Sequence, residues 1–135
     1  SSLFDEKYEE LTGLLTPEMT AMEQLLFLNR ELFHMIEDSI SLDLLARLYS
    51  TQLTTNGEKH LLDHNRIYYK LLRKIIAKGQ AEGQLSSRSN VNEMVKLYAL
   101  CERALLYDWC LCAGEYALTE YSAKVLPGFL SSFLP

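Results

Sequence analysis

The histidines are the side chains of this sequence whose spacing is closest to that of metal ligands. His60 and His64 lie four residues apart, and Glu31-Leu-Phe-His34 forms one Glu-x-x-His unit. Two imidazoles one helical turn apart can share a metal ion, but a site needs a third ligand, for which Glu31 and His34 are the obvious donors. A di-iron bundle needs the Glu-x-x-His unit on two helices. We therefore interpret His60 and His64 as polar residues at an exposed helix start, and predict no metal and no cofactor.

The cysteines and serines likewise give little indication of a metal-binding or catalytic site. Cys101, Cys110 and Cys112 fall within one expected helix, and the Cys-x-Cys pair has no second pair to complete a metal site. We interpret the three thiols as small buried hydrophobic groups in a reducing, cytoplasmic setting. The sequence has neither a nucleophile elbow nor a glycine-rich phosphate loop, so we do not predict an enzyme.

Aromatic and polar residues on three expected helices could together line a pocket for a small molecule. Such pockets are walled by apolar rings and contain a few polar groups. The same rings could instead be ordinary core, with Arg30 and Glu102 at the surface, because burying an unpartnered charge is costly. Both interpretations stay open. The candidate ligand-binding residues are Phe27, Arg30, Phe33, His34, Tyr68, Tyr69, Tyr98, Glu102 and Trp109.

The elements that would position these residues are all helical. The 135 residues are 48% hydrophobic, which is enough for one domain over residues 1–135 with a single core. No segment alternates as a strand does, and no apolar run approaches the roughly 18 residues of a membrane span. About six helices are expected: Leu3–Leu15, a second from the Thr16-Pro17-Glu18 start signal to Asp38, Ser41–Thr54, Leu61–Glu82, Val91–Cys112 and Leu118–Phe133.

The fifth expected helix has too little polar surface for one small domain to cover. Asn90, with Glu93 three residues later, predicts its start. Aliphatic and aromatic residues then occur on nearly every side, which favours burial between subunits. Just before it, Gly79 and Gly83 are four apart, and we expect both on one helical face where another backbone comes close.

The sequence resembles the C-terminal effector and dimerisation domain of the TetR family of bacterial transcriptional regulators. The matching phrases are KGQAEGQL at the end of the fourth expected helix and RALLYDWCLCAGEYAL across the fifth and sixth. The resemblance implies a helical bundle that binds a small-molecule effector, with the last two helices forming a four-helix bundle across a two-fold axis. It also implies a homodimer that acts as a repressor through an N-terminal helix-turn-helix domain.

That DNA-binding domain is expected to be missing from this chain, which lacks an initiator methionine and carries a net charge of −5. The chain alone should therefore dimerise without binding operator DNA. In the family, effector binding shifts the helices and moves the DNA-binding domains. The implied interface residues are Leu97, Ala104, Asp108, Leu111, Tyr121, Val125, Gly128 and Phe129, with Ala104 standing where the family often has glycine.

Two other functions remain open at this level. One is a helical-bundle metalloenzyme that uses His34, His60 and His64 with Glu31, and the other is a dimeric adaptor that binds no ligand. Metal analysis of the purified protein would separate the first of these from a regulator.

Overall fold

The computed structural model describes residues 2–54 and 66–135, and within these ranges every regular element is a helix. The prediction of an all-α fold is thereby confirmed for the described chain. The expected histidine pair, His60 and His64, lies outside the described residues. The helices are α1 (Ser2–Leu14), α2 (Ala21–Ser39), α3 (Leu42–Thr54), α5 (Arg66–Ala81), α6 (Val91–Leu111) and α7 (Leu118–Phe129), followed by the 3₁₀ turn η1 (Ser131–Phe133).

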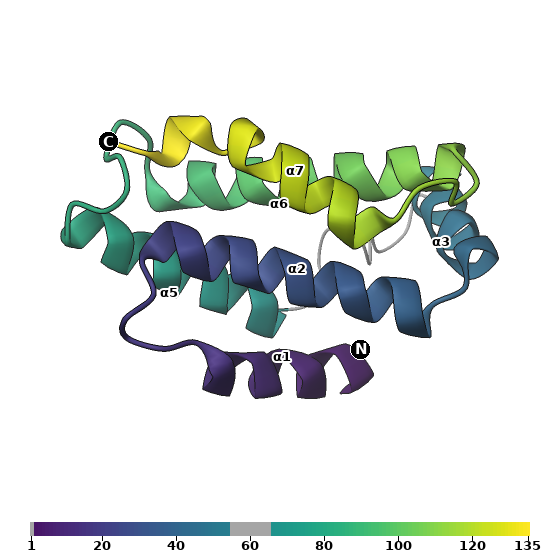
Figure 1. The fold of residues 1–135 in the computed structure, drawn as a ribbon, viewed down its shortest axis with the longest axis horizontal. Coiled ribbons are helices and arrows are strands. Elements are labelled where there is room, and N and C mark those ends of the chain that lie inside the picture. Colours follow the sequence, from purple (N-terminus) through teal and green to yellow (C-terminus); the bar gives the residue numbers. More distant parts are fainter. Residues whose placement is uncertain (1, 55–65) are drawn as a thin grey trace.

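The helices form three layers (Figure 1). Helices α6 and α7 run side by side in one layer, α2 and α5 form the middle layer, and α1 packs on the outer side of α5. Helix α3 packs against α6 at one end of the bundle. None of the described helices is long and apolar enough to cross a membrane. The residues with no exposed surface between the layers include Leu25, Leu28, Phe33, Leu72, Ile76, Tyr98 and Leu118.

Helix α2 begins four residues later than the sequence predicted, with its cap at Thr20 and not at Thr16. Thr16 does not cap it; instead the amide of Met19 bonds to the carbonyl of Thr16 at 3.1 Å and closes a turn. Thr20 is the cap, because its hydroxyl accepts from the amide of Glu23 at 3.1 Å while the Glu23 carboxylate accepts from the amide of Thr20 at 2.8 Å. This reciprocal box satisfies two amides that a helix start leaves unpaired, which one threonine before a proline cannot do.

The start of α6 follows the sequence prediction. The side-chain oxygen of Asn90 accepts from the amide of Glu93 at 2.8 Å, and the Glu93 carboxylate accepts from the amide of Asn90 at 3.0 Å. The end of α7 does not follow it, since the helix stops at Phe129 and tightens into η1. There the carbonyl of Phe133 accepts from the amide of Ser86 at 2.7 Å, so the chain end is tied to the turn before α6.

At Gly79 the backbone of α5 comes close to the first residue of α2. A Cβ atom at this position would lie 2.7 Å from both Ala21 Cβ and Leu85 Cδ1. Its carbonyl accepts from the amides of Gln84 and Leu85, which ends the helix. The prediction that Gly83 shares this helical face is wrong, because α5 ends at Ala81 and Gly83 takes a φ of +75° in the turn. Glycine suits this position because the backbone is left-handed there, and not because another helix comes close.

The two glutamines of the KGQAEGQL phrase hold the turn to its neighbours. The side-chain amide of Gln80 donates to the carbonyls of Ser86 and Ser89 at 3.0 and 2.7 Å. The side-chain oxygen of Gln84 accepts from the amide of Ala21 at 2.8 Å, at the first turn of α2. These bonds connect the end of α5, the polar turn and the start of α2, so this phrase fixes one end of the bundle.

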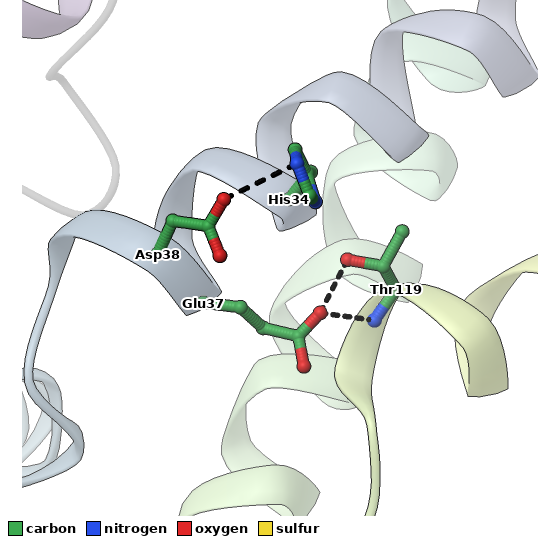
Figure 2. A network of polar contacts seen from close by, with 4 residues as sticks. All are labelled: His34, Glu37, Asp38 and Thr119. Atoms are coloured by element: carbon green, nitrogen blue, oxygen red, sulfur yellow. Dashed lines mark hydrogen bonds and ion pairs between the residues drawn. The ribbon is translucent and has the colours of Figure 1, made fainter.

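Glu37 of α2 caps the start of α7 from outside that helix (Figure 2). Its carboxylate accepts from the amides of Leu118 and Thr119 at 2.8 and 2.9 Å and from the hydroxyl of Thr119 at 2.5 Å. Ala117, the residue before α7, has no side chain that can do this. Burial raises the pKa of Glu37, but the bonds from Thr119 and Leu118 outweigh it, so the pKa is lowered below its ordinary 4.5. The contact sets the position of α7 on α2.

Replacing Gly79 with alanine is expected to lower the free energy of unfolding by about 1–3 kcal/mol, because the added Cβ meets Ala21 and Leu85 at overpacked distances. The matched control is Gly13→Ala in α1, where a Cβ meets nothing within 4 Å. That variant should be unchanged or more stable by up to about 1 kcal/mol, because alanine favours the helix. Urea denaturation of both variants measures the difference, and equal stabilities would refute the close approach.

Glu37→Gln is expected to destabilise the fold by about 1 kcal/mol near neutral pH, because the cap of α7 loses its charge. Since the folded-state pKa is lowered, this contribution is fully present above about 4.5 and is lost as pH falls through the folded-state value. Thermal unfolding at several pH values should show the two proteins converging in acid. Glu120→Gln, also in the first turn of α7, is the control; a similar loss there would make the effect one of helix dipole alone.

Candidate functional site

The centre of the bundle contains five polar side chains, referred to here as the buried polar cluster: Asn29, Tyr68, Tyr98, Glu102 and Ser122. They come from α2, α5, α6 and α7, and none is more than 5% exposed. Each of the four helices has a buried apolar stripe, and the polar residues of the cluster interrupt these stripes at the centre of the bundle. A buried polar group in such a position needs a partner, and side chains of the cluster supply most of these partners to one another.

The hydrogen bonds of the cluster converge on Glu102. One of its carboxyl oxygens accepts from the Asn29 side-chain amide at 3.0 Å and from the Tyr68 hydroxyl at 2.9 Å. The hydroxyls of Tyr68 and Tyr98 are 3.1 Å apart, and that of Tyr98 donates to the carbonyl of Leu25 at 2.8 Å. On the other side, the hydroxyl of Ser122 donates to the Asn29 side-chain oxygen at 2.7 Å. One continuous network therefore joins four helices.

Burial changes the protonation of Glu102. Loss of solvent raises its pKa from 4.5 to about 7, although the bonds from Asn29 and Tyr68 favour the ionised form and reduce the rise. Near neutral pH the central carboxyl therefore exists in both protonation states. A neutral carboxyl can also donate a proton to a partner, so a change of state would alter the bonding between α2, α5 and α6.

The structure separates the nine predicted ligand-binding residues into different surroundings. Tyr68, Tyr98 and Glu102 meet in the buried polar cluster, and Tyr69 is half-buried with its ring centre 6.4 Å from that of Tyr68. Phe33 and Trp109 are part of the hydrophobic core. The remaining three residues lie outside the core: Phe27, Arg30 and His34.

These three residues line two separate hollows in the surface. Phe27 and Arg30 line a groove between α2 and α7, called the α2–α7 groove below. His34 is exposed and pairs with Asp38 at 3.2 Å (Figure 2). It lines a smaller hollow of about 230 Å³ between α1 and α2, where Glu10, Glu31 and Asp38 also lie.

Asn29 and Ser122 were not predicted as site residues. Their sequence positions carried a usable signal: Asn29 is four residues after Leu25, and Ser122 is four after Leu118 and four before Leu126. A polar residue at helical spacing within a buried stripe indicates an internal hydrogen bond. The partner of such a residue comes from another helix, which this spacing does not identify.

The α2–α7 groove has a volume of about 440 Å³ and reaches down to the buried polar cluster. Asn29 and Ser122 belong to both. The remaining lining is mainly apolar, with one acidic and one basic side chain. It consists of Met19, Glu23, Leu26, Phe27, Arg30, Ala123, Leu126 and Pro127.

Helix α6 has two apolar faces, of which residues 2–54 and 66–135 cover one. Its buried stripe contains Val95, Tyr98, Glu102, Leu105 and Trp109. The other stripe remains largely open, with Leu100 50% and Leu111 68% exposed. It continues onto α7, where Tyr121 is 41% and Phe129 50% exposed. We call this surface the α6–α7 face: Leu97, Leu100, Ala104, Leu111, Tyr121, Val125, Gly128 and Phe129.

The eight predicted interface residues lie on or next to this face. Leu97 and Val125 are half-buried, and the other six are exposed. Asp108 is at the edge near the end of α6, where its carboxylate accepts from the hydroxyl of Tyr116 at 2.8 Å. Ala104 and Gly128 are both exposed in the part of the chain that the structure describes.

The cysteines and the metal hypothesis can be located for the described residues. Cys101, Cys110 and Cys112 are free thiols and half-buried, rather than fully buried as expected, and Cys101 and Cys110 pack against the edge of the core. Within residues 2–54 and 66–135, no group of three or more histidine, cysteine or acidic side chains is placed to hold a metal ion. His34 belongs to these ranges, whereas His60 and His64 lie outside them.

Comparisons of the chain with protein-family models, with curated proteins and with solved structures found no match.

Glu102→Gln is expected to flatten the dependence of stability on pH. Because the folded-state pKa is raised, the wild-type carboxyl contributes fully below about 4.5 and loses stability as pH rises through about 7. Between these limits the wild type should lose about 3 kcal/mol relative to the glutamine variant. Urea denaturation at a series of pH values measures this. Parallel curves for the two proteins would show that Glu102 titrates normally.

Proposed function

We propose that this chain is the dimerising, effector-responsive regulatory domain of a TetR-like transcriptional regulator. In this proposal two copies associate through the α6–α7 face, and a small molecule bound to each copy changes how the helices lie on one another. That change would control DNA binding by a helix-turn-helix domain of the same protein, in the cytoplasm. The observation that carries the proposal is the open apolar face of α6 and α7.

The α6–α7 face has the composition and continuity of a subunit interface. Large apolar side chains from two adjacent helices are exposed together, while scattered single exposures are usual on monomers. Small residues, Ala104 and Gly128, lie among them and would let helix backbones approach closely. Two copies related by a two-fold axis would place each pair of helices against the other pair, which gives a four-helix bundle.

The buried polar cluster supports an effector-responsive role. It joins α2, α5, α6 and α7 through one hydrogen-bond network, and α6 and α7 also carry the proposed interface. A ligand that changes any of these bonds would alter how the other helices lie on the interface pair. Allosteric coupling between a ligand site and a distant site requires a physical connection of this kind.

The net charge of −5 fits a domain that acts on DNA through another part of the protein rather than by its own surface. Two DNA-binding domains carried by a two-fold dimer would be held at a fixed separation. A shift in that separation away from one helical turn of DNA would weaken binding. Release of DNA on effector binding, as in a repressor, is the expected direction.

Two alternatives make different demands on the same residues. A dimeric adaptor would use the α6–α7 face in the same way but would not require a ligand. A metalloenzyme would need His60 and His64 to join His34 and Glu31. Metal analysis of the purified protein tests the second, and binding of a small molecule tests the first.

The dimer is tested by light scattering on the wild type and on Ala104→Arg. The wild type should have a mass of about 31 kDa, twice the 15.5 kDa of the chain. A buried pair of arginines facing each other should shift the variant to the monomer, because two like charges would be desolvated together. The expected dissociation constant rises by at least about tenfold.

Ala77→Arg is the matched control, since Ala77 is exposed on α5, away from the α6–α7 face. It should leave the mass and the thermal stability unchanged. A monomeric wild type would overturn the proposed interface, and so would equal effects of the two arginine substitutions.

A further inference from the structure

We propose that the α2–α7 groove binds an amphipathic organic anion, a carboxylate attached to an apolar body. This inference rests on the proposed function, since it names the chemical class of the effector and the place where it binds. The site differs from the one the sequence suggested, because of the nine candidate residues it uses Phe27 and Arg30. The groove has a polar floor, a cationic rim and apolar walls, and each of these suits one part of such a ligand.

The floor of the groove contains a buried donor that lacks a partner. Asn29 is 2% exposed and lines the groove. One N–H of its side-chain amide donates to Glu102, and its oxygen accepts from Ser122. The second N–H has no acceptor among residues 2–54 and 66–135. Because buried donors are nearly always bonded, an acceptor atom of a bound molecule is the natural partner.

The rim of the groove carries one positive charge that is open to a ligand. Arg30 is exposed, and in the described part of the chain no carboxylate forms an ion pair with it. Glu23, the acidic residue of the lining, has its carboxylate held on the amide of Thr20 at the helix start. A guanidinium binds a carboxylate through two parallel hydrogen bonds, which favours this anion over a neutral acceptor.

The walls specify an apolar body for the same ligand. Leu26, Phe27, Leu126 and Pro127 line the groove, which at about 440 Å³ is within the usual range for small-molecule sites. A single arginine among such walls suits one carboxylate on a hydrocarbon. A polyphosphate or sugar acid would leave several of its own polar groups facing apolar side chains.

The groove and the α6–α7 face lie on opposite flanks of α7. Ala123 and Pro127, four residues apart, line the groove, whereas Tyr121, Val125 and Gly128 belong to the face. Helical spacing places these two sets on different sides of the helix. A second copy on the face would therefore leave the groove open, and ligand binding and dimerisation can be measured separately.

A ligand in this groove would act directly on the buried polar cluster. Its carboxylate would accept from Asn29, whose other bonds go to Glu102 on α6 and Ser122 on α7. A ligand bond that moves or polarises the Asn29 amide would change both of these contacts. The groove is thus joined by two hydrogen bonds to the helices that carry the proposed interface.

The test is calorimetric titration of the protein with octanoate, with 1-octanol as the neutral probe of equal chain length. Octanoate should bind at one site per chain, and octanol at least about tenfold more weakly, because the charged bonds are lost. Arg30→Gln should weaken octanoate binding by about tenfold or more. Ala123→Leu, which adds bulk to the groove from an exposed position, should abolish it.

Arg73→Gln is the control for charge, because Arg73 is exposed on α5 and outside the groove. It should bind octanoate like the wild type, and circular dichroism should show that all variants keep the same helix content. No octanoate binding, equal binding of octanoate and octanol, or binding that survives both Arg30→Gln and Ala123→Leu would overturn the inference.

Light scattering on the same samples distinguishes the two proposals. A dimer that does not bind octanoate would overturn the groove proposal and leave the α6–α7 interface standing. A monomer that binds octanoate with the expected dependence on Arg30 would support the groove and overturn the interface.

Discussion

A carboxyl group at the centre of a helical bundle has to be hydrogen bonded, and this requirement governs how four helices of the protein meet. Glu102 has almost no contact with solvent, so Asn29 and Tyr68 must approach it from α2 and α5. Ser122 then holds Asn29 from α7. Apolar contacts alone would allow the helices to slide, whereas directional bonds to one oxygen fix their register. The cost of burying Glu102 is thus offset by a defined arrangement of the bundle.

The same arrangement leaves α6 with an apolar surface on each side. One stripe, around Tyr98 and Trp109, closes over the core, and the other, with Leu100 and Leu111, remains open. Glu37 of α2 holds the start of α7 in place. Because α7 lies beside α6, the open surface extends across both helices. The position of α7 also creates the α2–α7 groove on its other flank. The proposed regulatory role needs a ligand site and an association surface that share helices, and the position of α7 shapes both the groove and the open face.

How far the site could be predicted from sequence differs from residue to residue. Tyr68, Tyr98 and Glu102, three of the predicted ligand-binding residues, do lie together, because polar groups on apolar helices must find partners inside the bundle. Arg30 and His34 were placed in the same group, but the structure has both at the surface. Each directly follows a buried residue, Asn29 or Phe33, and which residue of each pair faces the core depends on how the partner helices rotate α2 about its axis. Asn29, directly before Arg30, is the residue that faces Glu102.

The sequence by itself determined the helices and most of their ends, since periodicity and caps such as Asn90 with Glu93 act within a few residues. It also determined that α6 is apolar beyond what one layer can cover. Only the tertiary structure decided that Glu37 caps α7, that Asn29 meets Glu102, and that Gly79 rather than Gly83 is the close contact. Those contacts join residues up to 82 positions apart. Local spacing constrains which side of a helix is buried, but the partner across the core depends on how whole helices pack.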